Sequence, residues 1–220
     1  LSLSDETKIE NKDEAINYTV LLVNTADYCS TTIDQLDEKL SEFVHPGEKI
    51  TVIFDKAKSL YGRLISRGIN FLLDRILSSE LNFSWREFEN FDWRHVAVED
   101  YSRYMVTLKN ILAFSTDNAA KTDLQKILSQ FNRDVYSWNF LDKVIDLITD
   151  EFLGCIIKLL QPLPPLATLG NEAKFDPKGV ISIGEQLLLD VELLKQLMYS
   201  LPECLSNESS TQNTSYKRVN

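Results

Sequence analysis

The stretch from Ile183 to Leu201 has the periodicity of a helix that packs against other helices. At about 100° per residue, one of its faces is apolar. The residues of that face are Ile183, Leu187, Val191, Leu194, Met198 and Leu201, widened by Leu193 and Leu197. Gln186 and Asp190 fall within the same arc, where an unpartnered polar group would cost about 1–3 kcal/mol. We therefore expect this helix to lie inside an assembly of helices and to end at Pro202, which removes a backbone donor.

Few residues interrupt similar patterns elsewhere in the chain. The 220 residues include only seven glycines and six prolines, which favours long helices and an all-α fold. The other expected helices span 13–44, 48–79 and 98–115, with a long helical region at 119–160. Whether 119–160 forms one bent helix or two joined near 137–139 stays open. Gly62 and Gly68 weaken the second helix and predict a kink or break there.

The pattern of hydrophobic residues changes near residues 80–100, where Phe83, Trp85, Phe88, Phe91 and Trp93 crowd a connecting segment. This aromatic segment either fills a gap between helices or forms an exposed patch for a partner. We expect two helical bundles stacked in tandem as an elongated rod. The predicted domains are a flexible lead-in at 1–12, a first bundle at 13–97, a second bundle at 98–205 and a disordered tail at 206–220.

The helix at 13–44 carries a continuous apolar stripe around Ile33, which predicts its core-facing side. The residues of the stripe are Tyr18, Leu22, Ala26, Cys29, Ile33, Leu36, Leu40, Phe43 and Val44. The segment His45-Pro46-Gly47 is expected to end this helix.

Net charge and cysteine content narrow the function classes. A formal charge of −10 argues against a nucleic-acid-binding protein and against simple attraction to anionic lipid. Three widely spaced cysteines favour reduced thiols used for packing over a disulfide framework. No apolar run is long enough for a transmembrane helix, and no signal peptide is visible. Because the first residue is Leu1, we expect the chain to be part of a longer protein.

Catalytic motifs are missing from the sequence. The chain has only two histidines, His45 and His95. Glu42 and His45 have the Glu-x-x-His spacing of di-iron helical bundles, but Pro46 ends the helix where that geometry would have to hold. No phosphate-binding glycine loop, zinc motif or nucleophile motif is present. We therefore expect no metal, no cofactor and no enzymatic activity.

Two stretches resemble one known family. Residues 24–40 (NTADYCSTTIDQLDEKL) and 184–190 (GEQLLLD) resemble signature stretches of the Vps-fifty-three subunit of the Golgi-associated retrograde protein complex, GARP, in the order found in that family. A weaker likeness spans most of 15–203. The lead-in, the tail and the central aromatic segment depart from the pattern.

The resemblance implies a fold and a role. The chain looks like the C-terminal region of that subunit, without the N-terminal coiled coil that assembles the complex with its other subunits. The implied fold is the helical-bundle rod of exocyst, COG and Dsl-type tethering subunits. The implied role is peripheral: capture of endosome-derived vesicles at the cytosolic face of the trans-Golgi network and endosomes. Vesicle or membrane components, SNAREs or small GTPases are the implied partners.

The resemblance also supplies candidate partner-binding residues at matched positions. They are Tyr28, Gln35, Glu38 and Lys39 in the first stretch and Glu185, Gln186, Asp190 and Lys195 in or beside the second. Alternatively, Gln186 and Asp190 bridge the last helix to its neighbours, and Tyr28 and Lys39 are ordinary surface residues. We expect the two stretches to meet in one composite patch.

Two other functions fit an all-α chain of this kind. A general helical scaffold or small-GTPase effector would bind an activated GTPase through one face of a bundle. A metal-dependent helical oxidase would hold iron or manganese.

Overall fold

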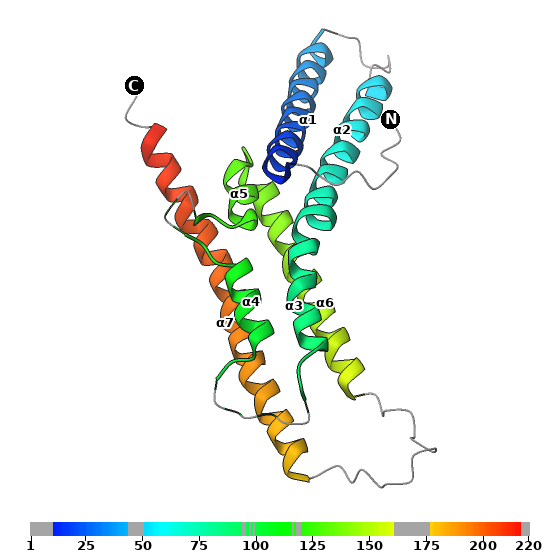
Figure 1. Cartoon of the computed structure of the whole chain (residues 1–220). Helices are drawn as coiled ribbons and strands as arrows, with labels where there is room; N and C mark the ends of the chain where they lie inside the picture. The colour runs from blue at the N-terminus through cyan, green and yellow to red at the C-terminus, as the bar shows by residue number, and fades with distance from the viewer. Residues whose placement is uncertain are drawn as a thin grey trace. The chain divides into compact units, whose positions relative to one another are not determined.

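The computed structural model describes residues 11–43, 51–93, 96, 98, 100–115, 117, 120–160 and 177–216, without the side chains of 41, 51–53, 177–180 and 203–216. All regular secondary structure within these ranges is helical, so the predicted all-α fold is confirmed (Figure 1). None of the described helices carries an apolar stretch long enough to cross a membrane. His45 and His95, the only histidines, lie outside the described residues.

The described helices follow one another along the chain. They are α1 (Lys12–Ser41), α2 (Thr51–Phe71), a π-helical segment η1 (Leu72–Leu77), α3 (Ser78–Glu89), α4 (Arg103–Ile111), α5 (Asp123–Gln130), α6 (Asp134–Leu160) and α7 (Pro177–Tyr216). The long region predicted at 119–160 is two helices that meet at residues 131–133, not near 137–139. Because α2 runs through Gly62 and Gly68, neither glycine breaks it.

Contacts divide the chain into two compact units. Unit 1 comprises Leu1–Leu77 and Lys126–Phe140, and unit 2 comprises Ser78–Gln125 and Leu141–Asn220. The sequence predicted a single boundary between residues 97 and 98. The two units are instead divided at other residues, because α5 and α6 each contribute to both units. The tandem stacking of two bundles stays a prediction.

In unit 1, α1 and α2 pack side by side (Figure 1). The Lys58 ammonium on α2 lies 2.8 Å from Asp34 and 3.2 Å from Asp37 on α1. The hydrogen bonds to these carboxylates, first the one to Asp34, raise the pKa of Lys58.

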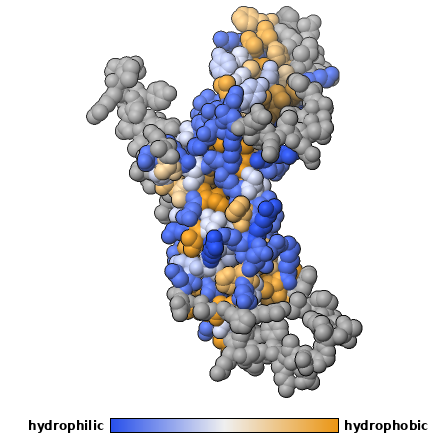
Figure 2. Space-filling view, viewed as in Figure 1, coloured by the Kyte–Doolittle hydropathy of each residue, from blue (hydrophilic) through white to orange (hydrophobic). Residues whose placement is uncertain are grey.

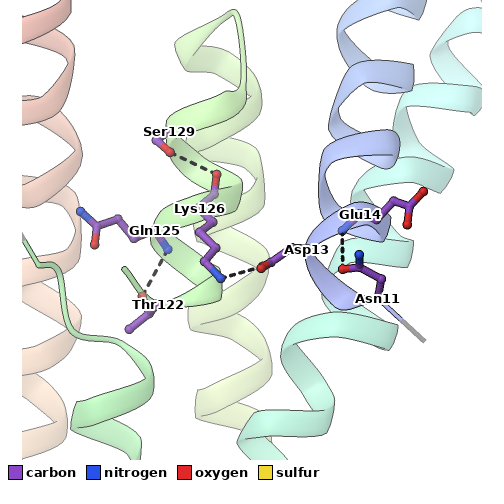
Figure 3. A network of polar contacts seen from close by, with 7 residues as sticks. All are labelled: Asn11, Asp13, Glu14, Thr122, Gln125, Lys126 and Ser129. Atoms are coloured by element: carbon purple, nitrogen blue, oxygen red, sulfur yellow. Dashed lines mark hydrogen bonds and ion pairs between the residues drawn. The ribbon is translucent and has the colours of Figure 1, made fainter. Parts of the chain in front are cut away.

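At the other end of α1, the Asn11 side chain caps the helix by accepting from the backbone N–H of Glu14 at 3.2 Å. Asp13 pairs there with Lys126 of α5 at 2.6 Å (Figure 3).

α1 approaches α2 closely at Gly68. A Cβ atom at this position would lie 2.5 Å from Cγ2 of Val23, whereas a Cβ at Gly62 would meet no atom within 4 Å. Gly68 therefore permits the close packing of the two helices, and Gly62 has no comparable packing role.

We expect Gly68→Ala to destabilise the chain, because overpacking costs about 1–3 kcal/mol and outweighs the gain of at most about 1 kcal/mol in helix propensity. Gly62→Ala is the matched control and should stabilise by about 0.5–1 kcal/mol, since it is exposed in the same helix. Urea unfolding followed by circular dichroism measures both. A stabilising Gly68→Ala substitution would contradict the close approach.

The apolar stripe predicted to face the core on α1 is largely exposed. Tyr18 is 67% exposed, Leu36 46% and Phe43 84%, and within the stripe only Ala26 is fully buried; Val44 lies outside the described residues. The other buried residues of α1, which are Ile16, Val20 and Val23, lie outside the predicted stripe. The prediction that this stripe faces the core is wrong, because α1 has a second apolar side that another helix can cover. Its packed side includes Val23, which lies against Gly68 of α2.

Unit 2 surrounds an aromatic cluster drawn from the predicted connecting segment. This segment is mostly the helix α3, in which Trp85 and Phe88 are buried while Phe83 is 65% exposed. The Phe88 ring lies 4.9 Å from Trp93, 4.8 Å from Tyr104 on α4 and 6.4 Å from Phe152 on α6, measured between ring centroids. Of the two predicted alternatives, the segment therefore fills the space between helices. Cys155 is also buried here, and burial raises the pKa of its thiol.

The last helix continues past its predicted end. Pro202 lies inside α7, which reaches Tyr216 and so extends into the range for which disorder was expected. The predicted end at Pro202 is wrong, since a proline removes only one backbone hydrogen bond and can be accommodated within a helix whose neighbouring turns are held. Leu201, directly before the proline, is 1% exposed and anchors this turn.

Candidate functional site

The second signature stretch contributes a buried carboxylate to unit 2. Asp190 on α7 is 0% exposed. One of its oxygens, Oδ2, accepts from the Ser102 hydroxyl at 2.6 Å and from the Tyr104 hydroxyl at 2.7 Å. The other, Oδ1, accepts from the backbone N–H of Ser102 at 3.0 Å and from Nε2 of Gln186 at 3.2 Å. The carboxylate thus has four donors, which makes its burial tolerable.

These donors join α7 to the start of α4. Ser102 is the N-cap residue of α4, and its hydroxyl bonds Asp190 instead of capping its own helix. The carboxylate lies where the backbone N–H groups of α4 begin, a favourable position for a negative charge. Gln186 adds a hydrogen bond to the backbone carbonyl of Asp100 at 3.1 Å. Burial and the nearby Asp190 raise the pKa of Tyr104, so its hydroxyl stays protonated and remains a donor.

This arrangement answers the question that the sequence left open for Gln186 and Asp190. Both are buried, Gln186 being 1% exposed, and both bridge the last helix to its neighbour. The other two candidates of this stretch, Glu185 and Lys195, are exposed on α7. Lys195 forms a loose pair with Glu192 at 3.8 Å, the kind of surface pair that contributes little stability.

The first signature stretch contains a polar clamp that the sequence analysis missed. Asn24 donates from Nδ2 to the carbonyl of Gln130 at 2.9 Å, and its Oδ1 accepts from the backbone N–H of Asn132 at 3.0 Å. One turn later, Asp27 accepts from Arg133 at 2.8 Å and from the hydroxyl of Tyr136. Burial, together with the hydrogen bond to Asp27, raises the pKa of Tyr136 to about 12. The clamp ties α1 to the turn between α5 and α6, and the spacing of three between Asn24 and Asp27 was the signal for it.

The four candidates of the first stretch lie outside this clamp. Tyr28 is 72% exposed, and Gln35, Glu38 and Lys39 are exposed too. Lys39 has no ion-pair partner within the described part of the chain. Figure 2 shows hydrophobic residues on the surface over α1. We refer to Tyr28, Gln35, Glu38 and Lys39 as the α1 row.

Each stretch therefore has a polar clamp, half-buried in the first stretch and buried in the second, and an exposed set of candidate residues. Lys39 belongs to unit 1 and Asp190 to unit 2, so the composite patch stays a prediction. Among the side chains that the structure describes, no group of three or more His, Cys, Asp or Glu is placed to hold a metal ion. The exposed residues can act by recognition, through an aromatic ring, an amide and charges of both signs.

Comparison with known proteins shows which protein family the chain matches. A family model described as the C-terminus of vacuolar protein sorting-associated protein 53 matches residues 185–220. The chain is 54% identical over 228 aligned positions to "Vacuolar protein sorting-associated protein 53" of Saccharomyces cerevisiae, a match that covers 100% of the chain and 28% of that relative. It is 22% identical over 216 positions to "Vacuolar protein sorting-associated protein 53 A" of Arabidopsis thaliana, covering 95% of the chain and 22% of that relative. No solved structure matches the chain significantly.

The chain thus spans about a quarter of the length of these relatives. The family match begins at Glu185 of α7 and includes Gln186, Asp190 and Lys195. The resemblance inferred from the two signature stretches is confirmed: the chain belongs to the family of vacuolar protein sorting-associated protein 53, and it matches the C-terminal part of that protein.

Proposed function

We propose that the chain is the C-terminal helical module of a GARP tethering subunit. In this role it helps to capture endosome-derived vesicles at the trans-Golgi network for retrograde transport. It acts by recognition and without catalysis, and it works at the cytosolic face of Golgi and endosome membranes as a peripheral protein. The other GARP subunits are its partners in the complex, and vesicle components such as SNAREs or small GTPases are its partners in capture.

The observation that carries this proposal is the 54% identity along the whole chain to a vacuolar protein sorting-associated protein 53. The structure adds a physical reason to assign recognition to the α1 row. Asn24 and Asp27 fix one side of α1 at the turn between α5 and α6, while Tyr28 and Lys39 project from it exposed. Exposed aromatic and charged groups on an anchored helix are suited to binding, because the backbone that carries them is already ordered.

The test is a substitution in the full-length subunit in cells. We expect Tyr28→Ala combined with Lys39→Glu to missort a recycling vacuolar sorting receptor while leaving the unfolding free energy within about 0.5 kcal/mol, since both residues are exposed. The matched control is Phe83→Ala with Lys109→Glu, which removes an exposed aromatic ring and reverses an exposed charge outside both signature stretches. The control should sort the receptor normally.

Normal sorting by the α1-row variant would show that this row is not the recognition surface. A pull-down with nucleotide-locked small GTPases distinguishes the alternative function, a general small-GTPase effector, from a tethering module. Binding to an activated GTPase without any effect on receptor sorting would favour a general GTPase effector over a tethering module.

A further inference from the structure

The exposed side of α1 carries a seven-residue repeat. Leu22, Cys29, Leu36 and Phe43 form one column with this spacing, and Tyr18, Thr25, Thr32 and Lys39 form a second. Leu21 and Tyr28 lie beside the second column, on the side away from the first, and are 63% and 72% exposed. We call these ten residues the α1 seam. Spacing by seven keeps side chains on the same side of two helices that wrap around each other, so the seam has the pattern of a coiled-coil partner surface.

The polar residues within the seam are already hydrogen-bonded inside α1. The Thr25 hydroxyl donates to the carbonyl of Leu21 at 2.7 Å, and the Thr32 hydroxyl donates to the carbonyl of Tyr28 at 2.8 Å. A helix docked on the seam would therefore meet the methyl groups of both threonines and would leave no hydroxyl unsatisfied. Only Lys39, at the C-terminal end of its column, presents a charge that needs a partner.

Charges around the seam indicate what kind of helix fits. Glu14, Glu38 and Glu42 are exposed beside it, and Lys39 is the cation among them. In an antiparallel pair of two copies centred on Tyr28, Glu14 would lie against Glu42, and in a parallel pair each charge would meet its own kind. Both pairings of α1 with itself are disfavoured by like-charge repulsion. The chain as a whole carries a charge of −10, so a basic helix is its natural complement.

We propose that the α1 seam binds, in a separate protein, an amphipathic helix with an apolar seven-residue repeat and basic flanks, with one acidic side chain meeting Lys39. The inference rests on the proposed role of the α1 row in recognition and specifies the chemistry of the partner. Tyr28 and Leu36 anchor the apolar contact, and Lys39 sets the register. A charged residue within an otherwise apolar seam commonly has that effect in coiled coils.

The test uses a synthetic helix of about four heptads with Leu at a and d, Lys at the flanking e and g positions and one Glu placed to meet Lys39. Its binding to the 220-residue chain is measured by fluorescence anisotropy at low and high salt. We expect binding that weakens with salt, and a loss of about tenfold or more when Glu replaces the flanking Lys residues. Tyr28→Ala and Leu36→Ala should each weaken binding by about tenfold, as expected for anchor residues.

Leu188→Ala on α7 is the control, because Leu188 is as exposed as Tyr28, at 72%, but lies outside the seam. It should bind the peptide as the unchanged chain does. Equal affinity for the basic and the acidic peptide, or for the Tyr28 and Leu188 variants, would overturn the proposal. So would a full-length protein that fails to bind the peptide while the isolated chain binds it, because the seam would then be covered by the same molecule.

The peptide-binding measurement and the receptor-sorting assay test the two proposals separately. A Tyr28→Ala, Lys39→Glu variant that missorts the receptor, in a chain that never binds the basic peptide, would overturn this inference and leave the proposed function standing. If that variant loses peptide binding but sorts the receptor normally, the seam recognises a basic helix as proposed. The proposed role of the α1 row in sorting would then be overturned.

Discussion

Replacing Asp190 by alanine is expected to lower the free energy of unfolding by about 3–5 kcal/mol. The substitution removes the acceptor of four donors at once: two on Ser102, one on Tyr104 and one on Gln186. These donors are buried with Asp190, so water does not replace the lost hydrogen bonds without opening the packing between α4 and α7. Urea unfolding followed by circular dichroism at 222 nm, a standard helix signal, measures the loss.

Two further variants keep the prediction testable if Asp190→Ala does not fold. Asp190→Asn retains the volume but replaces one acceptor oxygen by a donor, and it should cost less than alanine. Tyr104→Phe removes one donor to the carboxylate and should cost about 1.5–3 kcal/mol. Gln196→Ala, at an exposed position on the same helix, should change stability by no more than about 0.5 kcal/mol. An Asp190→Ala chain as stable as the Gln196 variant would show that the network does not hold the helices together.

The sequence identified the buried pair on α7 but could not supply its partners. Gln186 and Asp190 were recognisable because two polar residues one turn apart fell among leucines, and burial of both is now observed. Ser102 and Tyr104 are more than 80 residues away along the chain, as the sequence separations of 88 and 86 show. Periodicity describes one helix at a time, so it carries no information about which distant residue supplies a donor.

The same limit explains the error on α1. Periodicity located its apolar stripe, but it could not decide whether that stripe or the neighbouring side would be covered. The covered surface of α1 uses Val23 where Gly68 of α2 permits a close approach. It uses the polar residues Asn24 and Asp27 where the turn between α5 and α6 offers backbone and side-chain partners. Small and polar residues give a weak hydrophobic signal although they make the closest contacts. The strong signal came from the predicted stripe, whose exposed residues Tyr18, Leu36 and Phe43 belong to the α1 seam.

Phe88→Ala is the second substitution with a large expected effect, a loss of about 3–5 kcal/mol. Phe88 is 3% exposed, and its ring lies against Trp93, Tyr104 and Phe152, which come from three different parts of unit 2. Removing it opens a cavity between α3, α4 and α6 that rigid aromatic neighbours fill poorly. Urea unfolding measures the loss, and near-ultraviolet circular dichroism should report the altered packing of the tryptophans.

The matched control is Phe83→Ala, five residues earlier in α3, where the ring is 65% exposed and stability should change by no more than about 0.5 kcal/mol. Tyr104 links the two large effects, because its ring packs on Phe88 while its hydroxyl donates to Asp190. A double variant of Phe88 and Asp190 should therefore lose less stability than the two single losses added together, since each substitution already releases Tyr104. Strictly additive losses would mean that the aromatic cluster and the buried carboxylate stabilise unit 2 independently.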